Sequence, residues 1–332
     1  MLMLCIWSSN LRASQGWTLY IDNDKFGPRG TDRDYTGSFA LSYASPADKD
    51  LPLPVEEPLS LIDTRKHDPG SLLMHGFEFG LVAFTPANIT IETPQPGDRP
   101  YASLMYITSK RHRMYVHDNI SIAHSLTVGA FGLAAASDLQ QEIHEIVKSD
   151  QPRGWSNQIS DGGEPTLRYL WEYRRLGGDY TLAAHRRLQW GTAAGFSLGY
   201  LTEGIFGLNL RFGHLTDPWW SHHSSPTGFG DRLLTVPGQY ANGGGPYVWA
   251  SINTSWRLYN AFLQGQFRDS AVTYDSDELR DLTARLSVGA GWAFSNRWRL
   301  SYYLQTQTSE VRTGLADRTF TWGGIVLEVP TD

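Results

Sequence analysis

One histidine and one glutamine lie a single helical turn apart on the only segment of the chain with a convincing helical pattern. His144 follows Gln140 by four residues, so both side chains lie on the same face of a helix. Imidazole changes its charge near neutral pH, which makes histidine the side chain most often used for proton transfer. A histidine on a single helix in a chain otherwise made of strands therefore indicates chemistry.

The same segment carries signals for where the helix begins and what it contacts. Ser137 is a favourable N-cap residue, and Gln140 three positions later completes a capping-box pattern. An apolar stripe along this helix is formed by Leu139, Ile143 and Ile146, and we expect it to dock on a barrel rim. Two plainer interpretations stay open, namely Gln140 as a helix cap and His144 as an ordinary surface residue.

The rest of the chain alternates apolar and polar residues with a period of two, which predicts β-strands. In the segment 167–174, one face holds Leu167, Tyr169, Trp171 and Tyr173, and the other holds Arg168, Glu172 and Arg174. An apolar, aromatic face opposite a charged face is typical of strands with lipid outside and a polar lumen inside. A soluble sandwich is the alternative, but its strands are usually shorter. We therefore predict an all-β fold, a transmembrane antiparallel β-barrel with a short helix in an extracellular loop.

The count of strand segments fixes which loops share a rim. Twelve segments are predicted, at 16–24, 35–44, 72–85, 100–116, 118–132, 164–176, 188–202, 204–213, 246–258, 282–294, 296–309 and 317–329. Further strand-like stretches at 179–187 and 260–269 are expected to extend beyond the membrane. An even count puts both termini on the same side of the membrane.

Composition agrees with a barrel and excludes other classes. The chain has 33 glycines, 13% aromatic residues and a single cysteine, Cys5, so an internal disulfide framework is excluded. It contains no run of about twenty apolar residues, and its net charge of −6 argues against nucleic acid as a partner. Residues 1–16 are interpreted as a truncated or mis-started signal segment, and 17–332 as a single barrel domain.

Unusual polar residues gather in three connections of the predicted barrel. With a periplasmic N-terminus, the connections after the first, third and fifth strands all open at the outer rim. They hold Asn23 and Asp24 with Asp32, Arg33, Asp34 and Thr36; Asp98, Arg99 and Tyr101; and the helix with Gln140 and His144. Three separate clusters are thus predicted to converge on the extracellular side.

These clusters carry a resemblance to a known family. The chain resembles the lipid A 3′-O-deacylases of Gram-negative outer membranes through five sequence blocks in family order. They are IDNDKF at 21–26, TDRDYTG at 31–37, GDRPYAS at 97–103, QQEIHEIV at 140–147 and SEVRTG at 309–314. The blocks span nearly the whole barrel, and together they are specific.

The resemblance implies an active site between the outer wall and a loop helix, where acyl chains ester-linked at the 3′ position of lipid A are removed with calcium dependence. The residues that match the family's catalytic positions are Asn23, Asp24, Thr36, Gln140 and His144. Asp150 falls where relatives can carry a glutamate, and the substitution keeps the carboxylate. The implied enzyme is a carboxylic ester hydrolase whose partner is lipid A or lipopolysaccharide.

The residue types suit ester hydrolysis. A neutral imidazole at His144 would act as a base that activates water, and a hard divalent cation would stabilise the oxyanion. Calcium prefers oxygen ligands, and Asp24, Asn23 and Asp150 are suitable donors. By this hypothesis His144 is a base and not a nucleophile.

Several residues keep a second interpretation. Asn23 and Asp24 also favour turns. We expect substrate contacts from Asp34, Arg99 and Tyr101, but Tyr101 also fits an interfacial aromatic belt, and Arg99 fits either a lipid phosphate or a loop carboxylate.

Two other functions stay open. An outer-membrane phospholipase would use a serine nucleophile, yet Ser125 and His124 are adjacent strand residues that face opposite ways. A passive barrel, either a channel or a structural protein, is the alternative outside the enzymes.

Overall fold

The structure is a computed structural model that describes residues 15–28, 33–52, 70–183, 186–215, 217–221, 244–294 and 298–331. Most of the predicted signal segment 1–16 lies outside these residues, as does Asp32 of the first polar cluster. Those predictions therefore stay untested.

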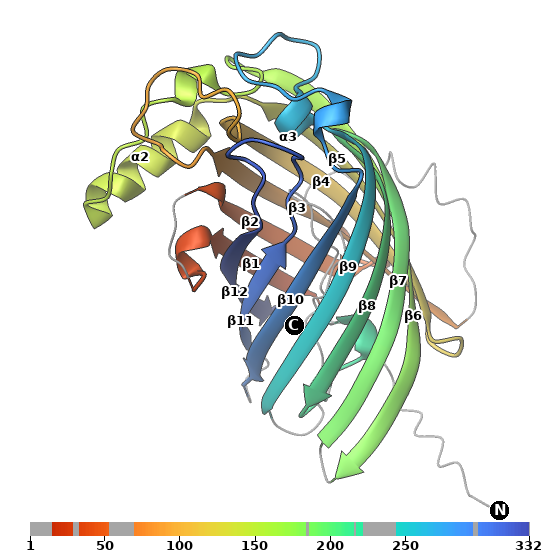
Figure 1. The fold of residues 1–332 in the computed structure, drawn as a ribbon. Coiled ribbons are helices and arrows are strands. Elements are labelled where there is room, and N and C mark those ends of the chain that lie inside the picture. The colour runs from red at the N-terminus through yellow and green to blue at the C-terminus, as the bar shows by residue number, and fades with distance from the viewer. Residues whose placement is uncertain are drawn as a thin grey trace, which may run out of the picture.

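A single sheet of antiparallel strands closes on itself as a barrel (Figure 1). The strands are β1 Gly16–Asn23, β2 Asp34–Pro46, β3 Ser71–Thr85, β4 Ala102–Tyr115, β5 Ile120–Phe131, β6 Glu164–Ala183, β7 Arg186–Gly199, β8 Leu201–Gly213, β9 Pro246–Asn260, β10 Leu282–Ala293, β11 Arg299–Gln307 and β12 Phe320–Pro330. Each strand pairs with its neighbours in the sequence, and β1 pairs with β12, from Gly16 opposite Pro330 to Asn23 opposite Gly323. The predicted twelve-stranded barrel is confirmed.

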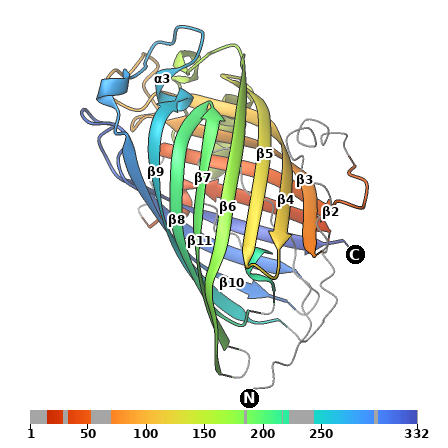
Figure 2. The same ribbon diagram turned by 90° about the vertical axis from the view of Figure 1, so that its right-hand side faces the viewer.

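Short helices occupy the connections. They are η1 Asp24–Phe26, α2 Ala135–Val147, η2 Trp155–Asn157, η3 Trp219–Ser221, α3 Ala261–Gln264 and η4 Ser276–Glu278. In two views at right angles, α3 and the loops near it lie at the end of the barrel opposite the far ends of β6 and β7 (Figures 1 and 2). Among the described residues, no helix is both long and apolar enough to cross a bilayer.

The two extra strand-like stretches have different outcomes. Residues 179–183 end β6 and residues 186–187 begin β7, so these two paired strands extend past their predicted ends. The prediction for 260–269 is wrong, because this segment turns into α3 instead. The Asn260 side chain accepts a hydrogen bond from the Phe262 amide and begins the helix, and Gly265, with φ of 71°, ends it.

The strands have the predicted two-faced character. On β10, Leu286 and Val288 are exposed while Arg285 and Ser287 between them are buried. On β6, Arg168, Glu172 and Arg174 are buried, and the aromatic residues between them are not. The outer wall is therefore an apolar surface, and the charged side chains face the lumen.

Side chains fill the lumen at its outer end. The largest buried apolar cluster consists mainly of aromatic rings from many strands, among them Tyr35, Phe84, Tyr106, Phe131, Tyr200, Phe262 and Trp322. Phe262 comes from α3 and contacts the rings of Phe84 and Phe131, each at 4.9 Å between centroids. The helix that replaces the expected strand thus inserts an aromatic ring into the core.

A layer of buried ion pairs borders this apolar core. Glu310, from the loop between β11 and β12, is paired with Arg99 and Arg257. Arg257 also pairs with Glu203 at 2.9 Å. Burial disfavours a charged carboxyl, but Arg99 and Arg257 outweigh burial and hold the pKa of Glu310 below its ordinary value. The loop that carries Glu310 is therefore joined to the barrel by a network of buried ion pairs, in which each charge is compensated by its neighbours.

We expect Glu310→Gln to destabilise the barrel by about 3–5 kcal/mol, because two buried guanidinium groups lose their shared anion. A carboxyl with a lowered pKa in the folded state stabilises the fold above its unfolded pKa, and this stabilisation is lost as pH falls through the folded pKa. The urea midpoint of the wild type in detergent should therefore fall faster than that of the variant at acidic pH. Equal acid sensitivity of the two proteins would contradict the role of Glu310.

Candidate active site on the outer wall

Helix α2 presents its polar face to the protein and its apolar face outward. Ala136, Gln140 and His144 are its buried residues. The apolar stripe is exposed, by 42% at Leu139, 46% at Ile143 and 78% at Ile146. The expectation that this stripe docks on the rim is therefore wrong, because the two chemically interesting side chains occupy the docking face.

The predicted start of α2 is also wrong. The helix begins at Ala135 after Ala134, which makes no side-chain cap, and Ser137 lies inside the first turn. The Ser137 hydroxyl accepts a hydrogen bond from Gln141 at 2.9 Å. Gln140 is consequently not part of a capping box, and the interpretation of this residue as a cap is excluded.

The docking surface for α2 is the outside of the barrel wall. Ala136 packs in one apolar cluster with Ala83, Tyr101 and Trp155, and Leu81 lies against the same cluster. Leu81 and Ala83 alternate along β3 with the exposed Phe79, so all three share the outward face of the strand. The space between α2 and the wall therefore lies outside the lumen, as the family resemblance implied.

His144 is oriented by the turn that ends α2. Lys148 adopts a left-handed conformation with φ of 55°, and the Ser149 amide donates to the His144 carbonyl at 2.9 Å. This turn reverses the chain and brings the carbonyl oxygen of Asp150 to the ring, where it accepts a hydrogen bond from His144 Nδ1. Asp150 thus contacts His144 through its backbone carbonyl, although Asp150 as a whole is exposed to solvent.

The chemistry of this hydrogen bond fixes the protonation of the ring. A carbonyl oxygen can only accept, so Nδ1 must carry the proton. In the neutral ring, Nε2 then has the free electron pair. Nε2 is therefore the ring nitrogen able to accept a proton, and Nδ1 donates to the Asp150 carbonyl in either charge state of the ring.

Gln140 lies one turn before His144 and is held by an aromatic neighbour. Its side-chain oxygen accepts a hydrogen bond from Trp155 Nε1 at 2.8 Å. The Trp155 ring lies 4.9 Å from that of Tyr101, whose hydroxyl donates to the Ile89 carbonyl at 3.0 Å. Tyr101 is therefore buried under η2, which excludes the second interpretation of this residue as part of an aromatic belt, and its expected substrate contact stays a prediction.

The turn after β1 lies close to the end of α2. The Asn23 side chain accepts from the Lys25 amide at 2.8 Å and begins η1, so it has the turn role considered from its residue type. Asp24 is buried, and its carboxylate accepts from the Arg33 amide at 2.5 Å. Lys25 Nζ donates to Ser149 Oγ at 2.9 Å, which joins this turn to the residue before Asp150.

Thr36 is directed to the outer wall by a β-bulge. The register between β2 and β3 shifts between Tyr35 and Gly37, so Thr36 is the extra residue. Its hydroxyl is 2.7 Å from that of Thr85. Thr85 is the last residue of β3 and lies on the outward face of that strand. A bulge that redirects one side chain is common beside functional sites.

Two expected substrate-binding residues belong instead to the buried ion-pair layer. Arg99 is 3% exposed, pairs with Glu310 and lies 4.6 Å from the Phe84 ring centroid. Asp34 has a left-handed backbone with φ of 66°, and its two carboxylate oxygens share the hydrogen bond from Arg318 Nε, at 3.1 and 2.8 Å. Both side chains are directed to the interior, so the loop-carboxylate interpretation of Arg99 is the one that the structure supports.

The oxygen donors suit a hard cation in their chemistry. Asn23 supplies an amide oxygen, and Asp24 and Asp150 supply carboxylate oxygens, which are donors that calcium prefers. In the described part of the chain, no three His, Cys, Asp or Glu side chains form a group that could hold a metal ion. A calcium ion here would therefore depend on amide, backbone and water oxygens around the buried Asp24.

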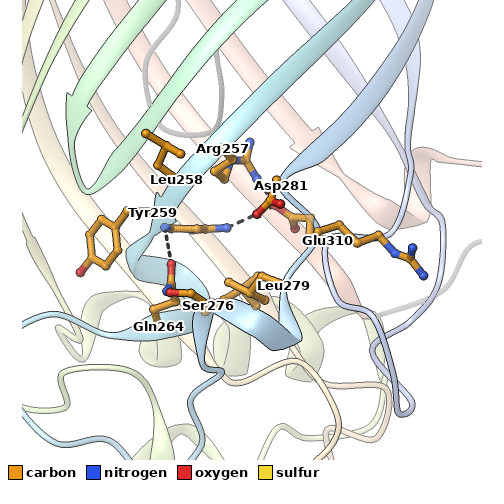
Figure 3. Close-up of a pocket in the computed structure, with 11 residues that line it drawn as sticks. Arg257, Leu258, Tyr259, Gln264, Ser276, Leu279, Asp281 and Glu310 are labelled. Atoms are coloured by element: carbon orange, nitrogen blue, oxygen red, sulfur yellow. Dashed lines mark hydrogen bonds and ion pairs between the residues drawn. The ribbon is translucent and has the colours of Figure 1, made fainter.

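A separate small pocket lies at the outer end of β9 (Figure 3). Arg257, Asn260 and Glu310 line it together with residues of α3 and η4. None of the residues expected in the site lines this pocket. It lies over the buried ion-pair layer and is distinct from the space beneath α2.

Three contributors to the site were not expected from the sequence. They are Trp155, Lys25 and Thr85, which bond Gln140, Ser149 and Thr36. Lys25 lies inside the IDNDKF block, so its position next to Asn23 and Asp24 was an available signal. Trp155 and Thr85 lie outside every block, and their partners are set by packing.

Fold and site together define an outer-membrane β-barrel with a candidate hydrolytic site on its outer wall. The family model described as outer membrane protein LpxR matches residues 1–330, and the chain belongs to this family. It is accordingly an outer-membrane lipid A deacylase, a hydrolase whose substrate is lipid A or lipopolysaccharide.

Comparison with solved structures agrees with the fold. LpxR from Salmonella typhimurium superposes with a TM-score of 0.72 and 18% sequence identity, covering 95% of this chain and 99% of that one. The beta domain of the Bordetella autotransporter BrkA is more distant, with a TM-score of 0.45, 7% identity and coverage of 95% and 98%. No curated protein sequence matches the chain.

The left-handed turn at Lys148 gives a test of how His144 is held. Lys148→Gly should keep the turn, because glycine adopts this conformation without strain, whereas Lys148→Val should strain it, because a β-branched residue fits a positive φ worse than lysine does. Hydrogen exchange measured by mass spectrometry should therefore accelerate over residues 140–150 in the valine variant alone. Similar exchange in both variants would show that the turn does not hold this segment.

Proposed function

We propose that this chain hydrolyses the ester that links the 3′ acyl or acyloxyacyl chain to lipid A, with water activated by His144. The observation that carries the proposal is the hydrogen bond from His144 Nδ1 to the Asp150 carbonyl, which leaves Nε2 as the basic atom. A general base must have its lone pair directed to the reacting water. In His144 the partner of Nδ1 is the Asp150 carbonyl, which cannot donate a hydrogen bond, so the proton stays on Nδ1 and the lone pair on Nε2.

The proposed reaction uses one residue as base and then as acid. Nε2 of His144 takes a proton from water while the water oxygen bonds to the ester carbonyl carbon. The carbon–oxygen bond to the sugar then breaks, and the imidazolium returns the proton to the departing sugar oxygen. The products are a free fatty acid and a lipid A with a 3′ hydroxyl.

Calcium is proposed as the cofactor, held by Asp24 with Asn23 and Asp150. When bound, it would stabilise negative charge on the ester oxygen. Asp24 suits this role because its carboxylate is buried beside the end of α2, where a cation would compensate its charge. Thr36 is proposed to line the same space from the wall side.

The position of the site supports a lipid substrate. Helix α2 packs on the outside of the wall at β3, and this wall carries the apolar surface of the barrel. Acyl chains can therefore approach the base without leaving the membrane. Entry from the lumen would require passage through the packed aromatic core.

The rival functions account for fewer of these contacts. In the described barrel, His124 bonds Tyr169 at 2.8 Å on the outer wall while Ser125 is buried toward the lumen, so these two residues form no phospholipase dyad. The apolar core of the outer half disfavours a channel. A phospholipid substrate hydrolysed through His144 is the alternative that activity measurements must separate.

The first test is incubation of the purified barrel with lipid A in calcium or in chelator, followed by mass spectrometry of the product. Calcium and intact His144 should both be needed for loss of the 3′ acyl chain, and His144→Ala should slow the reaction about 10²–10⁴-fold. His124→Ala is the matched control, since it removes an imidazole from the outer face of β5 and should leave the rate unchanged.

Parallel assays separate the rivals. Release of fatty acid from phospholipid but not from lipid A would favour a phospholipase. Full activity of His144→Ala would contradict the proposed base. No product from either lipid, with a barrel whose folding is verified by its heat-modifiable migration, would favour a passive barrel.

Asp150 has two roles that substitution can separate. In Asp150→Asn the backbone carbonyl still accepts from His144, so the rate at saturating calcium should stay within about twofold of the wild type. The calcium concentration for half-maximal rate should rise, because a carboxylate ligand is lost. A calcium titration of the variant decides this, and an unchanged midpoint would remove Asp150 from the metal site.

A further inference from the structure

The hydrogen bond between Trp155 and Gln140 can run in only one direction. An indole N–H donates and cannot accept, so the atom of the carboxamide that faces Trp155 must be the oxygen. The orientation of an amide side chain is often ambiguous, but here the partner settles it. The NH2 group of Gln140 is therefore directed away from Trp155.

The Trp155 ring is itself held in place by packing against Tyr101. The two ring centroids lie 4.9 Å apart with an angle of 55° between planes. Gly154 allows this approach, because a Cβ atom at that position would come within 2.5 Å of the Tyr101 ring. The donor to Gln140 is thus a buried ring, 4% exposed, in a fixed place on the outer wall.

Gln140 and His144 share one face of α2. They are separated by four residues, and both are buried against the wall. A donor next to the base of an ester hydrolase lies near the carbonyl that the activated water attacks. Preorganised donors directed at the developing oxyanion are worth about 10²–10³-fold in rate.

We propose that Trp155 is a positioning residue that orients the Gln140 carboxamide so that its NH2 group donates to the oxyanion formed during deacylation. This inference rests on the proposed function and assigns Gln140 a specific part in it. Without the indole donor, the amide can turn over and present its oxygen to the developing negative charge, which opposes the reaction.

Two substitutions test the direction of the hydrogen bond. Trp155→Phe keeps an aromatic ring against Tyr101 but removes the donor, and kcat should fall about tenfold with KM unchanged. Gln140→Glu keeps an acceptor for Trp155 but has no donor for the oxyanion, so its kcat should fall as far as that of Gln140→Ala. Trp171→Phe is the control, because it makes the same exchange among the outer-wall rings of β6 and β7, outside the site, and should leave kcat unchanged.

A double-mutant cycle shows whether Trp155 acts through Gln140. In the Gln140→Ala background, Trp155→Phe should cause no further loss of kcat. An equal loss in both backgrounds, or full activity of Gln140→Glu in an active barrel, would overturn the proposal. An inactive wild type would instead refute the proposed function.

A measurement that does not depend on activity tests the contact itself. The indole proton of Trp155 should exchange slowly with solvent in the wild type and in Gln140→Glu, and faster in Gln140→Ala. NMR of the barrel with labelled tryptophan, assigned through Trp155→Phe, reads this exchange. Fast exchange in the wild type would contradict the hydrogen bond and the inference with it.

Discussion

Closure of the barrel between β1 and β12 is the constraint on which the rest of the structure depends. A sheet in contact with lipid cannot leave backbone groups unpaired, and the pairing of Gly16 with Pro330 through Asn23 with Gly323 removes the last free edge. The antiparallel order of successive strands in this closed sheet also places the β1–β2, β3–β4 and β5–β6 connections at one rim. The residues around Asp24, Tyr101 and His144 meet for this reason.

The closed wall separates two environments with different tasks. Inside, aromatic rings and paired charges such as Glu310 with Arg99 and Arg257 fill the outer half of the lumen and hold the loops. Outside, α2 covers a few residues of β3 and encloses His144 and Gln140. Charged residues near the rim that face the lumen thus stabilise the loops, whereas the titratable residues on the outside of the wall belong to the candidate site.

Alternation, parity and motif blocks were enough to predict the barrel, its strand count and the rim where the clusters converge. They could not predict the face that α2 buries, because the usual rule puts apolar residues inward and an outer wall in lipid reverses it. Arg99 shows the same limit, since its partner Glu310 is distant in the sequence. The bulge at Thr36 breaks the alternation of faces, so a strict period of two cannot predict it. Trp155 lies outside every motif block, and packing sets its position.

The outward apolar stripe of α2 has a kinetic consequence. The proposed site lies on the lipid-facing side of the wall, where a lipid substrate arrives by lateral diffusion, so enzyme and substrate meet in two dimensions. Their encounter rate follows the mole fraction of lipid A in the surface around the barrel and not its concentration in the bulk. Dilution of that surface with inert lipid, at constant total substrate, therefore slows such an enzyme. A change in how lipid A is distributed between the two leaflets changes the deacylation rate in the same way, without any change in the protein.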